Sequence, residues 1–263
     1  MPLHQFVKIS RPTQYYWDLL HVLVRRDLKV QYEGTLLGFG WTLLMPFLHL
    51  GIFYFLFKVI LNSGTPRFTS YAFIGIISYT WFQSALSQAA TSTSGNRDLA
   101  LRPGFPVPLL PFIAVSSSML HFVFTWPLIL LIILFEGHRL PAAILAMPIV
   151  MAVQFLLCLG LGYLAAIVNI IFRDTKNIMD VLLRLFYFLS PVFYDPQLVP
   201  QRYRWLYDLN PMVTLLQAYR DIILHGVMPQ MFALSVLALF SIVVAWIGLR
   251  VFQTQSYRFL EAL

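Results

Sequence analysis

The sequence predicts an all-α integral membrane protein with six transmembrane helices, an amphipathic N-terminal interface helix, and re-entrant short helices before the last span. Three observations predict this fold class. The 263 residues are 59% hydrophobic and only 11% charged, a composition foreign to soluble domains. The apolar residues gather in charge-poor runs of about the 20 residues that cross a bilayer. Short basic segments separate these runs.

A basic amphipathic helix is expected over residues 13–33. At 3.6 residues per turn its polar and apolar side chains fall on opposite sides. The polar side carries Asp18, His21, Arg25 and Lys29, and the apolar side carries Trp17, Leu20, Leu23, Val24 and Leu28. Such a helix lies along a membrane surface. Asp27 interrupts the apolar side, which indicates that the segment also contacts protein.

Glycines separate this helix from the first span. Gly34, Gly38 and Gly40 allow the chain to bend, and Trp41 marks the membrane interface. The first span is expected over residues 36–57 and the second over residues 71–90. Residues 91–111 begin polar, carry Arg97, Asp98 and Arg102, and then contain four prolines. Because proline interrupts a helix, this segment is predicted to be a rigid loop.

The next three spans are expected over residues 109–135, 142–172 and 177–194. The last of these contains Asp180 and Arg184, which lie four residues apart and share a helix face. Ionisable groups inside a membrane are costly unless they are paired or face water. Two interpretations stay open: a mutual ion pair that extends towards the cytoplasm, or an Arg184 that receives an anionic headgroup at a lateral entrance.

Residues 195–221 are too polar and too broken by proline to cross the membrane. They predict a re-entrant pair of short helices on the periplasmic side, before a sixth span over residues 232–251. Six spans leave both termini on one side. That side carries eleven Lys and Arg residues and the opposite side six, which places both termini in the cytoplasm. No cleavable signal peptide is expected, because the first thirty residues lack an apolar core.

Composition and motifs exclude several functions. The net charge of +7 is spread among short loops, so nucleic-acid binding is not expected. The eleven acidic residues are scattered, and the sequence contains no paired-histidine metal motif, P-loop or nucleophile elbow. Cys158 stands alone in an apolar run, which excludes a disulfide framework. If the chain transports actively, another subunit must therefore supply the energy.

Five ordered motifs carry a resemblance to a known family. They are Tyr32 to Pro46 with Thr35, Leu37-Gly38 and Trp41; Phe105-Pro106; Asn169-x-x-x-Arg173-Asp174; Ser190 to Tyr194; and Asn210-Pro211-Met212 with Tyr219-Arg220. In this order they resemble the permease subunits of ABC-2 type polysaccharide exporters, which carry O-antigen, teichoic acid or capsule. The extra prolines around Gly104 depart from the family's loop and leave its helical content open.

The resemblance implies a membrane subunit of an ATP-driven exporter of undecaprenyl-pyrophosphate-linked polysaccharide, most naturally O-antigen, in the bacterial inner membrane. Teichoic acid or capsule is the alternative polymer. Two copies of the chain would form the channel among membrane lipids. Two copies of a separate ABC ATP-binding subunit would bind ATP and Mg²⁺, with no cofactor in this chain.

The resemblance also implies roles for particular residues. Aromatic faces stack on sugar rings, and basic helices attract anionic headgroups. The implied substrate channel is lined by Phe39, Trp41, Phe186 and Tyr187. The implied lipid pyrophosphate entrance consists of Arg25, Arg26, Lys29, Gly38 and Arg184. The implied ATPase coupling surface consists of Arg97, Asp98, Arg102, Arg173 and Asp174. Each group has a plainer interpretation, as helix packing, lipid anchoring or ordinary positive-inside charge.

Two rival functions remain to be separated from export of polysaccharide. One is an enzyme or flippase that acts on a lipid-linked sugar without ATP. The other is an ABC-2 exporter of drugs or small lipids, which the Asn169 to Asp174 and Ser190 to Tyr194 motifs disfavour.

Overall fold

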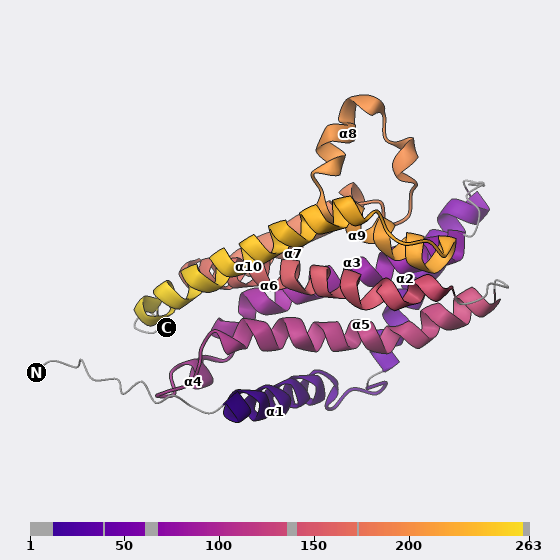
Figure 1. The fold of residues 1–263 in the computed structure, drawn as a ribbon. Coiled ribbons are helices and arrows are strands. Elements are labelled where there is room, and N and C mark those ends of the chain that lie inside the picture. Colours follow the sequence, from indigo (N-terminus) through magenta and orange to yellow (C-terminus); the bar gives the residue numbers. More distant parts are fainter. Residues whose placement is uncertain (1–12, 39, 61–67, 136–140, 173, 260–263) are drawn as a thin grey trace, which may run out of the picture.

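The computed structural model describes residues 13–38, 40–60, 68–135, 141–172 and 174–259, and all regular elements in these ranges are helical. Figure 1 shows long helices that run alongside one another, with the start of α1, α4 and the end of α10 at the left of the view. The helices α9 and η4 lie towards the opposite end. The all-helical prediction is therefore confirmed within the described residues.

The long elements occupy the regions where spans are predicted. They are α2 (Gly40–Tyr54) with its π-helical extension η1 (Phe55–Ile60), α3 (Phe68–Gly95) and α5 (Leu109–Phe135). The 3₁₀ helix η2 (Ala142–Ala146) leads into α6 (Met147–Ile171), and α7 (Thr175–Leu189) and α10 (Met231–Phe259) follow. Among the described residues, three stretches are long and apolar enough to cross a membrane: Leu109–Leu134, Ala142–Ile171 and Met231–Gln255.

Helix α7 is shorter than the span predicted over residues 177–194. It ends at Leu189 and has 15 residues, so it is about 22 Å long at 1.5 Å per residue. The Ser190 hydroxyl donates a hydrogen bond to Phe186 O at 2.8 Å, and the Val192 amide donates to Ser190 O at 2.7 Å. Pro191 has no amide hydrogen for another helical turn. The residues from 190 to 194 are therefore irregular.

The predicted loop over residues 91–111 is partly wrong. Helix α3 continues to Gly95, and a short helix, α4 (Arg97–Ala100), follows at once. Helix α5 then begins at Leu109, with Pro111 in its first turn. A helix tolerates proline there because the first amide groups have no acceptor within the helix. Only residues 101–108 match the expected loop.

The turn between α1 (Thr13–Tyr32) and α2 depends on glycine, as the sequence predicts. Gly34 has a φ of +77° and Gly38 a φ of +50°, backbone angles that side chains with a Cβ rarely adopt. Because these angles end the helical path, α2 begins only at Gly40 and Leu36 is fully exposed. The first span therefore starts later than residue 36.

Helix α1 packs against α5, and Figure 1 shows the two lying alongside each other. Leu23 and Val24 are buried together with Ile113 of α5. Trp17, expected on the same apolar side, is 61% exposed, so the packed face begins one turn later than predicted. The apolar side of α1 is thus covered largely by protein.

Helix α3 lies at the centre of the bundle. It contacts α2, α5, α6, α7 and α9 and is buried at most positions from Phe68 to Thr93. Beside it, α6 and α10 approach each other backbone to backbone: a Cβ on Gly160 would lie 2.5 Å from Ala245 N, and one on Gly248 would lie 2.6 Å from Gly160 O. Such glycine contacts bring membrane helices into close packing.

Short helices lie between α7 and α10. They are η3 (Pro196–Leu198), α8 (Gln201–Asp208), α9 (Pro211–Arg220) and η4 (Asp221–His225). The side chain of Asn210 caps α9 by accepting a hydrogen bond from Met212 N at 2.9 Å. Helix α8 is exposed, whereas α9 is largely buried and ends in a wholly buried Arg220. The charge count includes Arg220 among the six basic residues of the periplasmic side, but this side chain is buried in the bundle and is not part of an exposed loop.

Candidate functional site

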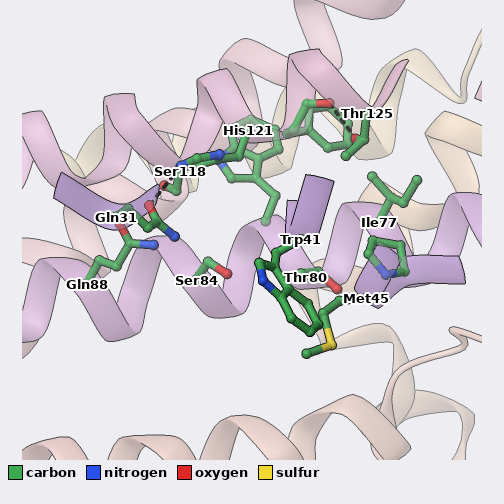
Figure 2. Close-up of a pocket in the computed structure, with 13 residues that line it drawn as sticks. Gln31, Trp41, Met45, Ile77, Thr80, Ser84, Gln88, Ser118, His121 and Thr125 are labelled. Carbon is green, nitrogen blue, oxygen red and sulfur yellow. Dashed lines mark hydrogen bonds between the residues drawn. The ribbon is translucent and has the colours of Figure 1, made fainter. Parts of the chain in front are cut away.

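A cavity of about 290 Å³ lies between α2, α3 and α5 and reaches the last turn of α1. Figure 2 shows the residues that line it. They come from all four helices and combine aromatic and aliphatic side chains with hydroxyls and amides: Gln31, Trp41, Met45, Pro46, Ile77, Thr80, Trp81, Ser84, Gln88, Ser118, His121, Phe122 and Thr125.

The floor of the cavity is a polar stripe on α3. Thr80, Ser84 and Gln88 follow one another at intervals of four residues, which places them on one helix face. Within the described residues, none of these three side chains has a hydrogen-bond partner. The stripe therefore presents two hydroxyls and one amide to the cavity.

Helix α5 supplies a second polar stripe, formed by Ser118, His121 and Thr125. The Ser118 hydroxyl donates to Val115 O at 2.9 Å, and the Thr125 hydroxyl donates to Phe122 O at 2.6 Å. Both hydroxyl oxygens keep lone pairs that can accept a hydrogen bond from a ligand. The cavity thus lies between acceptors on α5 and groups on α3 that can donate or accept.

Aromatic residues form the remaining wall. Trp41, at the start of α2, is 37% exposed, and Figure 2 shows it beside Thr80 and Met45. Trp81 is buried and stacks on Phe122, with ring centroids 4.7 Å apart and an interplanar angle of 21°. Its indole Nε1 is buried and has no hydrogen-bond partner among the described residues.

The rim of the cavity joins α1 to α5. Gln31 Oε1 and His121 Nε2 are 2.9 Å apart and form a hydrogen bond, drawn as a dashed line in Figure 2. None of the lining residues in the described part of the chain is Asp, Glu, Lys or Arg. The cavity is suited to an uncharged, hydroxylated group.

The structure separates the four residues expected to line a channel. Trp41 lines the cavity, whereas Phe186 and Tyr187 pack against α3, with ring centroids 6.3 Å from Phe82 and 5.0 Å from Tyr79 respectively. The Tyr79 hydroxyl donates to Leu183 O at 2.6 Å and further ties α7 to α3. The fourth residue, Phe39, lies outside the described residues.

The residues expected at the lipid pyrophosphate entrance also divide. Arg25 and Lys29 are exposed on α1, and Lys29 Nζ lies 3.8 Å from Glu33 Oε1 in an exposed ion pair. Arg26 Nη2 instead donates to Asp27 Oδ1 at 3.1 Å and to Asn96 Oδ1 at 2.7 Å. Gly38 forms the turn described above. Arg184 is exposed on α7, which lies on the opposite side of the bundle from α1 in Figure 1.

Asp180 and Arg184 form no ion pair in the described structure. Asp180 instead accepts a hydrogen bond from the Ser87 hydroxyl of α3 at 2.8 Å. The acid is therefore held by the helix beside it, and the guanidinium remains exposed.

The expected ATPase-coupling residues gather near one end of the bundle. Arg97, Asp98 and Arg102 are exposed on or just after α4. The Asn169 side chain donates to Ser94 Oγ at 2.9 Å, so the end of α6 lies beside the end of α3. Asp174 is exposed just before α7. Arg173 lies outside the described residues.

A buried cation was missed by the sequence reasoning. Arg220 Nη2 donates to Val192 O at 2.8 Å and to Tyr71 O at 3.3 Å. Gly75 leaves room for this contact, because a Cβ there would lie 2.8 Å from Nη2 and 2.3 Å from Val192 O. The motifs from Ser190 and from Asn210 meet at this point. These two motifs were the features of the sequence that pointed to this contact, but each one alone is also explained by a proline that ends or begins a membrane helix.

Comparison with known proteins identifies relatives along the whole chain. The family model described as ABC-2 type transporter matches residues 18–224. The chain is 32% identical to the O-antigen export system permease protein RfbA of Myxococcus xanthus, over 98% of this chain and 100% of that protein. A protein of the same description from Klebsiella pneumoniae is 27% identical over 98% and 99% of the two chains. The polysialic acid transport protein KpsM of Escherichia coli is 24% identical over 90% and 93%.

Proposed function

The chain belongs to the ABC-2 type transporter family, and from this we propose that it is the membrane subunit of an ATP-driven exporter of undecaprenyl-pyrophosphate-linked polysaccharide. O-antigen is the polymer that we propose. The observation that carries this choice is the 32% identity with an O-antigen export permease over 98% of the chain. The long apolar helices make the chain a multi-pass membrane protein.

A capsule polysaccharide is the second candidate, because a polysialic acid transport protein is 24% identical over 90% of the chain. Teichoic acid is the other alternative polymer for a permease of this family. The higher identity and the complete coverage of the O-antigen permease favour O-antigen.

We further propose that a separate ATP-binding subunit binds ATP and Mg²⁺, since this sequence contains no P-loop. Two such subunits would act with two copies of this chain. The exposed charges of α4 and the hydrogen bond from Arg26 to Asn96 support a docking surface at the end of the bundle that α1 and α4 share.

The proposed location is the bacterial inner membrane, with both termini in the cytoplasm. The burial of Arg220 strengthens the charge argument, because the outer side then carries five basic residues against eleven. The exposed Arg25 and Lys29 would lie on the cytoplasmic side, where they could attract a lipid pyrophosphate.

Deletion of the gene, followed by complementation, tests the proposed function. We expect the deletion strain to lose polysaccharide from its surface and to accumulate lipid-linked polymer inside the cytoplasmic membrane. The complemented strain should recover only when the partner ATPase keeps its Walker lysine. Normal surface polysaccharide in the deletion strain, without internal polymer, would overturn the proposal.

A further inference from the structure

We propose that the cavity between α2, α3 and α5 binds one sugar ring of the transported polymer, within a single protomer. This inference rests on the proposed export of polysaccharide and assigns a binding site for it. The cavity volume of about 290 Å³ lies at the lower end of the range of about 300–1,000 Å³ for ligand pockets. A site of this size holds a single ring and not a folded stretch of polymer.

Unpaired polar groups indicate a hydroxylated ligand. Thr80 is exposed and Ser84 and Gln88 are half-buried, and none of these three side chains has a hydrogen-bond partner among the described residues. Sugar hydroxyls both donate and accept, so one ring could form hydrogen bonds with the Gln88 amide and with the hydroxyls of Thr80 and Ser84 together.

The aromatic wall suits the other surface of a sugar. Trp41 is partly exposed beside the polar stripe of α3. The C–H face of a pyranose ring is apolar and can stack on an indole, while its hydroxyls point outward to polar partners. Met45 and Ile77 extend this apolar surface. The cavity therefore has one face for stacking and two for hydrogen bonds.

The lining of the cavity does not suit the pyrophosphate or the lipid tail of the substrate. None of the lining residues that the structure describes carries a fixed charge, so a pyrophosphate would lack a counter-ion. A lipid tail would fill the volume but leave the Gln88 amide and the hydroxyls of Thr80 and Ser84 without hydrogen-bond partners. An uncharged sugar ring satisfies both surfaces.

Photocrosslinking in cells tests this site on the complete transporter. Met45, which is 49% exposed at the cavity, is replaced by p-benzoylphenylalanine. The matched control carries the same residue in place of Leu239, which is 65% exposed on α10. The probe is the cell's own lipid-linked polysaccharide, detected on the purified chain by periodate staining after irradiation.

We expect glycan on the chain only with the crosslinker at position 45, and only in cells that synthesise the polymer. Crosslinking to phospholipid alone, or equal glycan at position 239, would overturn the sugar site. If gene deletion leaves surface polysaccharide unchanged, the export proposal fails first. If gene deletion does abolish surface polysaccharide but no glycan is crosslinked at position 45, the export proposal stands and only the cavity assignment is refuted.

A second measurement uses variants that change the cavity without the crosslinker. Ser84→Leu fills it, and Gln88→Leu removes an amide at similar size. Ser235→Leu on α10 is the control, because Ser235 is exposed and its hydroxyl donates to Phe232 O of its own helix. The export rate per folded complex should fall about five- to tenfold in both cavity variants. Unchanged rates in a folded Gln88→Leu complex would contradict the assignment.

Discussion

The guanidinium carbon of Arg220 lies 3.5 Å from the centroid of the Tyr71 ring, so the end of α9 is fixed against the start of α3 by a cation–π contact. The wholly buried side chain also donates to Val192 O at 2.8 Å. This arrangement joins three segments that are distant in the sequence. It holds the short helices before α10 against the core of the bundle.

Truncation of this cation should destabilise the fold. Arg220→Ala removes the contact with Tyr71 and leaves the carbonyl of Val192 without its donor. We expect a loss of about 2–4 kcal/mol in the free energy of unfolding. Thermal unfolding of the purified protein, followed by tryptophan fluorescence, measures the change. Arg204→Ala on the exposed helix α8 is the control and should change it by less than about 0.5 kcal/mol.

Added volume between α6 and α10 should separate these helices. Gly160→Ala places a Cβ at 2.5 Å from Ala245 N, which forces the backbones apart and costs about 1–3 kcal/mol. Gly51→Ala on α2 is the matched control, because nothing lies within 4 Å of its Cβ, and it should be neutral or slightly stabilising. Equal stability of the two variants, measured by thermal unfolding, would refute the close contact.

Tyr187 separates helix packing from a role in the polymer path. Its ring lies 5.0 Å from that of Tyr79 and 5.7 Å from that of Phe193. Tyr187→Ala should therefore lower the amount of folded protein, at about 3 kcal/mol for a large-to-small change, with export per folded complex unchanged. Leu185→Ala, exposed on the same helix, is the control. Normal folding with slowed export would instead place Tyr187 on the polymer path.

The basic face of α1 is tested by charge removal. Arg25→Gln combined with Lys29→Gln removes two exposed charges and leaves Arg26, which holds Asn96. Each charge near an anionic surface contributes about 1 kcal/mol, so capture of the lipid pyrophosphate should weaken and export should slow by about tenfold or more. Arg202→Gln with Arg204→Gln on α8 is the control pair. Unchanged export in correctly inserted protein would leave these residues as lipid anchors only.

Cysteine labelling tests the orientation. Native Cys158 is buried and should remain unlabelled by a membrane-impermeant maleimide. Gln201→Cys on α8 should react in intact cells, whereas Asp98→Cys on α4 should react only after the membrane is opened. Both positions are exposed. The reverse pattern would invert the topology derived from the charge count.

Local composition determined the class of this protein and the order of its helices. The apolar runs that predict spans depend only on length and hydrophobicity, so the predicted range 109–135 coincides with α5. Polar or broken segments were harder to bound. The end of α3 at Gly95 and the short helix α4 inside the predicted loop depend on where the helical path ends and resumes, and the proline content of the segment does not determine this.

The faces of the helices were decided only by the tertiary structure. Helix α3 is buried on most of its surface, so no amphipathic pattern reveals its rotation. The spacing of Thr80, Ser84 and Gln88 is visible in the sequence, but nothing there indicates that this stripe faces His121 across one cavity. Arg220 likewise reads as a loop charge until α9 packs beneath Tyr71. Such pairings arise from packing between distant segments, and lipid around the bundle imposes no simple division into apolar inside and polar outside.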